Sequence, residues 1–370
     1  MAGRRSARAL PLVLASLLVV LSCSRERPSA SSAVPAPPIE RPDPRARWYQ
    51  LGADGLRKIA GPGAIAPTAS LPWTVQLRVA DMSFLADSLY CALNGSGLAR
   101  IGFDAEGSPA FAYFSDSLIF AQRTITTLVP RAGTLTVHLY YNALLNTVPA
   151  ERLALRGVSL VSFLPDSDQY AFLIPPFQRK NPEWEAVGFA AVSAGEYLFE
   201  WKRIDPAETR FVYTRYFPDS KRESSSTREE YIGALGGRRE ARGGASARAR
   251  LFDACLAEIA RASPGSSTHF SVRSRGAALR RAFRFEGEGT SIVTVPVFED
   301  RDGASALLPD ARVLTIAADG AVRALPLPTP PRGARYTDMV RAGGFLVLPW
   351  EEKLFTEVGA AGILFYSLER

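Results

Sequence analysis

Short apolar runs, each closed by a turn signal, are the feature that most limits what this chain can fold into. From Trp48 onward the runs are brief and alternating, and Gly, Pro or Asp separates one from the next. The clearest runs are Leu89–Leu93, Thr134–Tyr141, Tyr170–Ile174, Phe211–Phe217, Ser291–Phe298 and Phe345–Trp350. Many are rich in Val, Ile, Tyr, Phe and Thr, which pack well on a pleated surface. Many short strands joined by turns predict a sandwich, a barrel or a propeller.

Two sequence elements repeat within this region. The first, a run that turns at an acidic residue near Gly, occurs at Leu51–Leu56, Ile101–Gly107 and Ile316–Ala321, with a looser copy at Ile204–Thr209. Asp-Gly is a strong hairpin signal, because Gly supplies the positive φ that primed turns need. The second, a Gly followed by an apolar run and then Trp, occurs at Gly195–Trp201 and Gly344–Trp350. Asp81-Met82 and Asp338-Met339 also stand a few residues before comparable runs.

The repeats suggest a unit of about 50 residues with about four strands, which is the size of a propeller blade. We therefore predict a mainly β, β-propeller-like domain over residues 48–370 with six or seven blades. The strands Phe345–Trp350 and Gly362–Leu368 are expected to share a blade with Trp48–Ile59 and so to close the fold. A two-domain β protein with coincidental hairpins is the alternative.

One stretch departs from the strand pattern. Thr227-Arg228-Glu229-Glu230 resembles a capping box, and a later apolar stripe has helical spacing. The stripe consists of Leu251, Phe252, Cys255, Leu256 and Ile259. We predict an α-helical insertion at about residues 224–263 that packs on the β body through this stripe. A partner-binding helix, or an anion- or lipid-binding role for its arginines, is the alternative.

The first residues have the three-part layout of a secretory signal peptide. Met1–Arg8 is short and basic, Leu10–Leu21 is mostly apolar, and Ser22 precedes Cys23. The apolar run has about a dozen residues, fewer than the roughly 20 that a membrane-spanning helix needs. The stretch Val20–Cys23 resembles a relaxed bacterial lipobox, a resemblance that implies acylation of Cys23 with fatty acids such as palmitate. An ordinary cleaved signal peptide with an incidental cysteine is the alternative.

Residues 1–22 are thus predicted to be a lipoprotein signal peptide, and residues 23–47 an acylated cysteine with a Pro-rich tether. Ser24–Arg47 contains several prolines among Ser, Ala and Arg, which favours extended polyproline II. Two or three acyl chains hold a protein firmly on a membrane. The expected location is the cell envelope, lipid-anchored to a bacterial membrane, on the periplasmic side or at the outer membrane.

Charge and composition exclude several classes of function. The chain is 47% hydrophobic and 22% charged, which excludes wholesale disorder and a coiled coil. The net charge of +7 includes the three arginines of the signal peptide. The remaining excess of about +4 is spread along the chain, so no nucleic-acid partner is expected.

Motifs for catalysis and metal binding are missing from the sequence. The two histidines, His138 and His269, are distant, and a His-based zinc site needs three or four ligands. No G-x-S-x-G elbow, P-loop or G-x-G-x-x-G fingerprint occurs. Asp300–Gly303 starts like a calcium loop, but Ala311 stands where the bidentate Glu belongs, so the segment is interpreted as a turn. No catalytic residue, metal or cofactor is predicted, and the sequence favours a protein without enzymatic activity while leaving the question open.

Trp184 is the best candidate for a binding residue. It lies in the polar segment Arg179–Glu185, so its ring is expected to have fewer core neighbours than Trp201 or Trp350. Trp, Tyr and Arg are enriched in binding sites, and Arg179 and Lys180 accompany it. Packing at a blade edge is the alternative role for Trp184.

The cysteines of the domain, Cys91 and Cys255, are read as separately buried thiols. Cys91 falls in a predicted strand and Cys255 on the apolar stripe of the predicted helix. A disulfide between them in an oxidising compartment is the alternative.

As a whole, the chain resembles uncharacterised bacterial lipoproteins of the spirochaete type with β-propeller-like repeats. The resemblance rests on Val20–Cys23, the tether and the repeats within residues 48–370. It implies a membrane-anchored binding or scaffold module whose partner is an envelope protein or a glycan, with the specific ligand unknown. One alternative is a carbohydrate-active enzyme of the envelope, with acidic residues beside Trp184 and Trp350. The acidic residues are Glu183, Glu185, Glu351 and Glu352. A purely structural envelope protein is the other alternative.

Overall fold

A computed structural model of the whole chain describes the larger part of its compact unit, Pro42–Arg370. The described residues are 43–52, 54–66, 77–94, 96–104, 107–114, 124–131, 133–140, 160–167, 169–193, 196–203, 210–231, 247–262, 271–272, 282–286, 292–300, 303–316, 320–331, 333–352 and 359–369. Residues 1–42 lie outside them, and with these the predicted signal peptide, Cys23 and most of the tether. His269 also lies outside the described residues.

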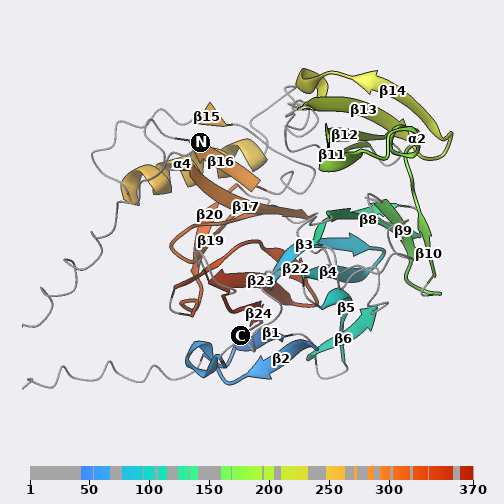
Figure 1. Cartoon of the computed structure of the whole chain (residues 1–370). Helices are drawn as coiled ribbons and strands as arrows, with labels where there is room; N and C mark the ends of the chain where they lie inside the picture. The colour runs from blue at the N-terminus through green and yellow to red at the C-terminus, as the bar shows by residue number, and fades with distance from the viewer. Residues whose placement is uncertain are drawn as a thin grey trace, which may run out of the picture. The chain divides into compact units, whose positions relative to one another are not determined.

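Antiparallel strands dominate the compact unit, as the short apolar runs predict (Figure 1). Sheet 1 contains β3 (Arg78–Leu85), β4 (Ser88–Asn94), β5 (Gly97–Phe103) and β6 (Pro109–Phe114). Sheet 2 contains β7 (Thr124–Arg131), β8 (Thr134–Tyr140), β9 (Leu160–Leu164) and β10 (Gln169–Phe172). Sheet 3 contains β11 (Trp184–Ser193), β12 (Glu196–Arg203), β13 (Phe211–Phe217) and β14 (Arg222–Ser226). In each of these sheets, strands that follow one another along the chain are neighbours.

The two remaining sheets each have six strands. Sheet 4 contains β15 (Ser271–Val272), β16 (Ala282–Glu286), β17 (Ile292–Asp300), β18 (Gly303–Leu307), β19 (Arg312–Ile316) and β20 (Val322–Pro326). The closing sheet contains β1 (Ala46–Gly52), β2 (Gly55–Ile59), β21 (Ala334–Tyr336), β22 (Val340–Ala342), β23 (Phe345–Glu352) and β24 (Ala361–Ser367). The prediction of a mainly β, propeller-like fold is confirmed. The described residues make five sheets where the repeat length suggested six or seven blades, because two sheets take six strands each.

The closing sheet joins both ends of the domain. β1 lies between β2 and β24, so that Trp48 is paired with Ile59 on one side and with Leu364 on the other. Figure 1 shows these first strands, in blue, beside the red strands β23 and β24. The predicted pairing of the first and last strands of the domain is therefore present.

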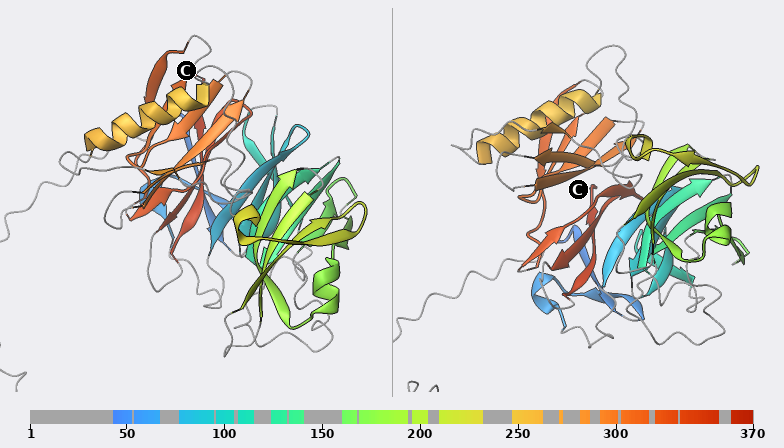
Figure 2. Two further views of the ribbon diagram at one scale, coloured as in Figure 1. Left: turned by 90° about the horizontal axis from the view of Figure 1, so that it is seen from above. Right: turned by 45° about the horizontal axis from the view of Figure 1, so that its top comes forward.

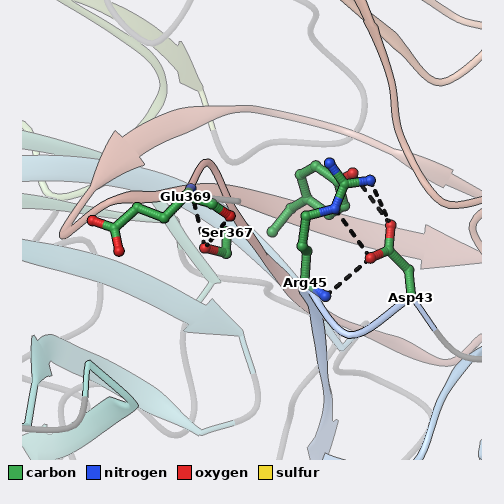
Figure 3. Close-up of polar contacts among 5 residues, drawn as sticks. Asp43, Arg45, Ser367 and Glu369 are labelled. Atoms are coloured by element: carbon green, nitrogen blue, oxygen red, sulfur yellow. Dashed lines mark hydrogen bonds and ion pairs between the residues drawn. The ribbon is translucent and has the colours of Figure 1, made fainter.

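A polar cluster extends this closure beyond the strands. The Asp43 carboxylate accepts hydrogen bonds from the Arg45 backbone nitrogen at 2.9 Å and from its guanidinium at 3.0 Å (Figure 3). The Tyr366 hydroxyl donates to the same carboxylate at 3.2 Å. The Arg45 carbonyl accepts a bond from the Ser367 nitrogen at 2.9 Å. The chain thus enters the domain at a point tied directly to its last strand.

Strands with both faces covered supply the core. On β4, Leu89, Cys91 and Leu93 pack toward the closing sheet. Tyr90 and Ala92 on the same strand pack toward sheet 2. This two-sided burial explains why the run Leu89–Leu93 is continuously apolar, since alternation is needed only where one face meets water.

In the described part of the chain, helix occurs in short segments and in one longer element. The short ones are η1 (Pro62–Ala64) and α2 (Pro176–Lys180). The predicted helix is α4 (Ala247–Ala262), and it buries Leu251, Cys255 and Ile259 as its stripe requires. Cys91 and Cys255 are buried in different clusters and are not joined by a disulfide. Among the helices in the described ranges, none is long and apolar enough to cross a membrane.

The predicted capping box forms the hydrogen bonds that define it. The Thr227 backbone nitrogen donates to the Glu230 carboxylate at 3.0 Å, and the Glu230 nitrogen donates to the Thr227 hydroxyl at 3.1 Å. This reciprocal pair satisfies two donors at the start of a helical turn. It also places Tyr231 against Tyr213 of sheet 3, with the ring centroids 5.5 Å apart.

Candidate binding surface on sheet 3

Sheet 3 is built from strands with one apolar and one polar face. On β12, Tyr197, Phe199 and Trp201 are buried and belong to a hydrophobic cluster that also contains Leu160 of sheet 2. The residues between and beyond them are Glu196, Leu198, Glu200 and Lys202, of which Leu198 is buried and the other three are half-buried. Because successive side chains of a strand point to opposite faces, these two groups define a first face toward sheet 2 and a second face that is polar around a buried Leu198.

Trp184 lies on the first face and is a core residue. Its side chain is 7% exposed, and its ring packs edge-on against Phe177 with centroids 5.8 Å apart. Trp184 therefore has the alternative role, packing on the edge strand of its sheet, although it remains slightly more exposed than Trp201 and Trp350. The neighbours come from α2, which brings Phe177 onto Trp184 and Trp201.

Arg179 and Lys180 are exposed at the end of α2, apart from the buried ring of Trp184. This short helix is fixed at both ends. The Asn181 backbone nitrogen donates to the Phe177 carbonyl at 2.9 Å. At the other end, the Glu223 carboxylate of β14 accepts a hydrogen bond from the Phe177 backbone.

Glu223 was not singled out by the sequence, yet it joins α2 to the aromatic core. The Trp201 indole nitrogen donates to the Thr214 hydroxyl at 2.9 Å, and that hydroxyl donates to Glu223 at 3.1 Å. Burial raises the pKa of Glu223, while its hydrogen bonds from Thr214 and Phe177 act in the opposite direction. These partners occupy the carboxylate, so Glu223 links β14 to Thr214 of β13 and to Phe177 of α2.

The second face of sheet 3 carries a group of polar contacts. The Tyr213 hydroxyl donates to the Glu200 carboxylate at 2.8 Å. Arg215 lies 3.0 Å from Glu196 and 3.6 Å from Glu230, so it bridges two strands and the helical turn after β14. Burial and the bond to Glu200 raise the pKa of Tyr213, which keeps its hydroxyl protonated as a donor.

Phe211 stands at the edge of this second face. Its side chain is 44% exposed, and it is paired across the sheet with Lys202. An exposed aromatic ring beside Tyr, Arg and Lys side chains is typical of a protein or glycan contact surface. The sequence signal for this face is limited to the polar residues that interrupt the two runs, which are Glu200 and Lys202 in Glu196–Arg203 and Arg215 in Phe211–Phe217.

The acidic residues considered for carbohydrate chemistry do not converge with exposed tryptophans. Glu351 pairs with Arg335 at 3.0 Å, and Glu352 accepts a bond from the Ala360 nitrogen at 2.8 Å, both in or beside the closing sheet. Trp350 beside them is buried. Glu183 is exposed at the start of sheet 3, and the Glu185 side chain lies outside the described residues.

Metal binding has no candidate cluster in the described part of the chain. No group of three or more His, Cys, Asp or Glu side chains lies together there in a way that could hold an ion. The segment that begins like a calcium loop joins two strands, since Asp300 of β17 is paired with Gly303 of β18. That pairing is the geometry of a tight hairpin.

Comparison with known proteins identifies the family of this chain, while the likenesses to solved structures are weak. Among solved structures, the chain is similar to the calcium-binding protein regucalcin from Agrobacterium tumefaciens, with 7% identity, a TM-score of 0.33, and coverage of 80% of this chain and 93% of that one. It is also similar to BBS1N in complex with ARL6DN, with 9% identity, a TM-score of 0.19, and coverage of 88% and 89%. Neither likeness is close enough to carry an argument about ligands. No curated protein matches. The model described as "Family of unknown function (DUF8086)" matches residues 38–370, and the chain belongs to that family.

Proposed function

We propose that this chain is a lipid-anchored protein of the bacterial envelope whose β domain is a binding or scaffold module. The observation that carries the proposal is the second face of sheet 3. This face combines the exposed ring of Phe211 with Lys202, Tyr213 and Arg215. Aromatic and cationic side chains on a strand-built surface suit an envelope protein or a glycan, because they give contact area together with hydrogen-bond donors.

The anchor is assigned to Cys23, on the lipobox-like stretch Val20–Cys23. Acyl chains contribute about 0.8 kcal/mol per buried methylene, so removing them should abolish membrane retention. Fractionation of cells that express Cys23→Ala should find the protein in the soluble fraction, with wild type in the membrane pellet after an alkaline wash. A variant that still sediments and still resists the wash would remove the anchor from the proposal.

The binding surface is tested separately by site-specific photo-crosslinking in cells. A benzoylphenylalanine residue replaces Phe211, and in a control chain it replaces Val322 of sheet 4, whose exposed fraction of 48% is similar. Ultraviolet light should give a discrete crosslinked product from position 211 that is absent from position 322. Equal products from both positions, or none from position 211, would place the binding surface elsewhere.

The carbohydrate-active alternative needs two carboxylates facing across a cleft. Nothing in the described residues favours it over a binding module, since Glu351 and Glu352 bond within their own sheet and its neighbouring turn. A purely structural envelope protein has no requirement for an exposed ring such as Phe211, and the crosslinking experiment separates that reading from a binding module.

A further inference from the structure

The start and the end of the domain meet at one end of the β1–β24 pair. The register pairs Ala46 with Tyr366 and Gln50 with Gly362, so the beginning of β1 lies beside the end of β24. Both views of Figure 2 show the blue strands from the start of the domain next to the red strands from its end. The chain before Ala46 leaves from this same end. A pull that separates the two chain ends therefore acts on the first pair of residues before any other.

Three residues at this point form a group that we call the Asp43 cluster, which consists of Asp43, Arg45 and Tyr366. The Asp43 carboxylate accepts hydrogen bonds from the Arg45 guanidinium and from the Tyr366 hydroxyl. The Arg45 guanidinium carbon also lies 4.8 Å from the centroid of the Tyr366 ring. Each member thus contacts the other two, and the cluster crosses from the entry of the chain to β24.

Burial of one member distinguishes this cluster from an ordinary surface ion pair. The Arg45 side chain is 43% exposed, but Tyr366 is 1% exposed and packs in the core of the closing sheet. A buried hydroxyl that loses its acceptor retains the full cost of its desolvation. Separating Asp43 from Tyr366 is therefore opposed by more than the screened attraction of two surface charges. The hydrogen bond from Arg45 lowers the pKa of Asp43, which keeps the carboxylate charged at neutral pH.

The end of β24 is itself held in place beyond the cluster. The Ser367 backbone nitrogen donates to the Arg45 carbonyl at 2.9 Å, and the Leu368 nitrogen donates to the Gly344 carbonyl at 2.9 Å. The Glu369 nitrogen donates to the Ser367 hydroxyl at 3.3 Å (Figure 3). Since Gly344 directly precedes β23, the Asp43 cluster joins the entering chain to a point that two strands fix.

From these contacts we infer that the Asp43 cluster is a latch that protects the closing sheet against tension along the N-terminal segment. Without it, such a pull separates β1 from β24 one residue pair at a time and uncovers the buried side chains of β1. With it, several contacts must break together before the first pair opens, and forced opening depends on the height of that barrier. The inference does not depend on the lipid anchor or on whether sheet 3 binds a partner.

Single-molecule force measurements test the latch, with handles on the first and last residues of the Cys23→Ser chain. The variants are Asp43→Ala and Tyr366→Phe, and the second keeps the buried ring and removes only its hydroxyl. Asp310→Ala is the matched control. Asp310 also pairs with the arginine two residues later, Arg312, at 2.7 Å, but it lies at the turn between β18 and β19.

The time before the first lengthening step at constant force gives the rate of opening. Both cluster variants should open at least about tenfold faster than wild type, and Asp310→Ala should match wild type. The double variant should open no faster than Asp43→Ala, because both changes remove the same hydrogen bond. Equal rates for the cluster variants and wild type would overturn the inference. Equal acceleration by Asp310→Ala would also overturn it, because the effect would then not be specific to the closure.

Hydrogen exchange without force shows whether the effect is local. In Tyr366→Phe, the amides of β1 and β24 should exchange at least about threefold faster than in wild type, while those of β4 should keep the wild-type rate. Faster exchange in all three strands would mean that the substitution lowers the stability of the whole domain. That result would overturn the assignment of the cluster as a latch of the closing sheet.

Discussion

The carboxylate of Asp81 lies 2.7 Å from the backbone nitrogen of Leu128, so a side chain of sheet 1 accepts a hydrogen bond from the first strand of sheet 2. Its other oxygen accepts a bond from the Met82 nitrogen at 2.9 Å. Asp338 makes the same local bond to Met339, at 2.8 Å. Both methionines are fully buried. The two Asp-Met pairs of the sequence thus mark one structural device used twice.

Replacing Asp81 with Ala should cost about 2–3 kcal/mol of the free energy of unfolding, because the buried Leu128 and Met82 nitrogens lose a charged acceptor. Urea unfolding at pH 7 measures the change. Asp87→Ala, at an exposed turn of the same sheet, is the control and should stay within about 0.5 kcal/mol of wild type. Equal losses for the two variants would show that the bond to sheet 2 contributes nothing.

Gly362 should tolerate no side chain. A Cβ at this position would lie 2.0 Å from the Tyr49 carbonyl oxygen and 2.6 Å from the Trp350 ring. Since β1 and β23 hold these groups on either side of β24, Gly362→Ala should lose about 1–3 kcal/mol or more of stability. Gly102→Ala is the matched control, because no atom lies within 4 Å of its Cβ position. Thermal unfolding compares the two, and a Gly362→Ala variant as stable as the control contradicts the packing of the closing sheet.

Trp184→Ala should cost about 3–5 kcal/mol of stability, as for other large aromatic residues removed from a core. The reason is its burial against Phe177 in the cluster of sheet 3. Arg179→Ala and Lys180→Ala, exposed on the adjoining helix, should change the free energy of unfolding by less than about 0.5 kcal/mol. If Trp184→Ala unfolds like wild type, the ring is not part of the core and returns as a candidate binding residue.

Stability should fall as the pH drops below about 6.5, because of His138. Burial lowers the pKa of His138 to about 3, whereas the same side chain has its ordinary pKa of 6.5 in the unfolded chain. Between these values the unfolded chain binds a proton that the folded chain does not, so acid favours unfolding. At pH 5 the loss amounts to about 2 kcal/mol.

The effect of His138 is isolated by comparing unfolding curves of wild type and His138→Phe at pH 7 and pH 5. The phenylalanine keeps a ring against Phe189 but has no proton to bind. Wild type should lose more stability than the variant over this interval, whatever their difference at pH 7. Parallel pH profiles would mean that His138 is accessible to protons in the folded state.

The sequence predicts the parts of the fold that local pattern decides. The run Leu89–Leu93 is apolar throughout because β4 is covered on both faces, and the capping box at Thr227 forms as its residues require. The pairing of the first and last strands followed from the spacing of apolar runs near both ends. The run of β4 and the capping box depend on residues that are neighbours along the chain. The pairing of the two ends depends on the number and spacing of the strands.

The features that sequence reasoning missed depend on residues distant along the chain. Trp184 stands in a polar segment, and only the return of α2 over sheet 3 brings Phe177 to its ring. The apolar stripe of α4 predicts a helix packed on the β body. It does not predict that the helix covers the face of sheet 4 that carries Leu314. Glu223 carries no motif, and its role arises from Thr214 and Phe177 meeting it from other elements.

The central claim, a binding module held on a membrane by lipid at Cys23, is tested most directly by the mass of the N-terminal peptide. The protein is extracted from membranes with detergent, digested, and its first peptide measured by mass spectrometry. We predict a peptide that begins at Cys23 and carries the added mass of a diacylglyceryl group. A mature N-terminus at any other residue, or an unmodified Cys23, would contradict the account.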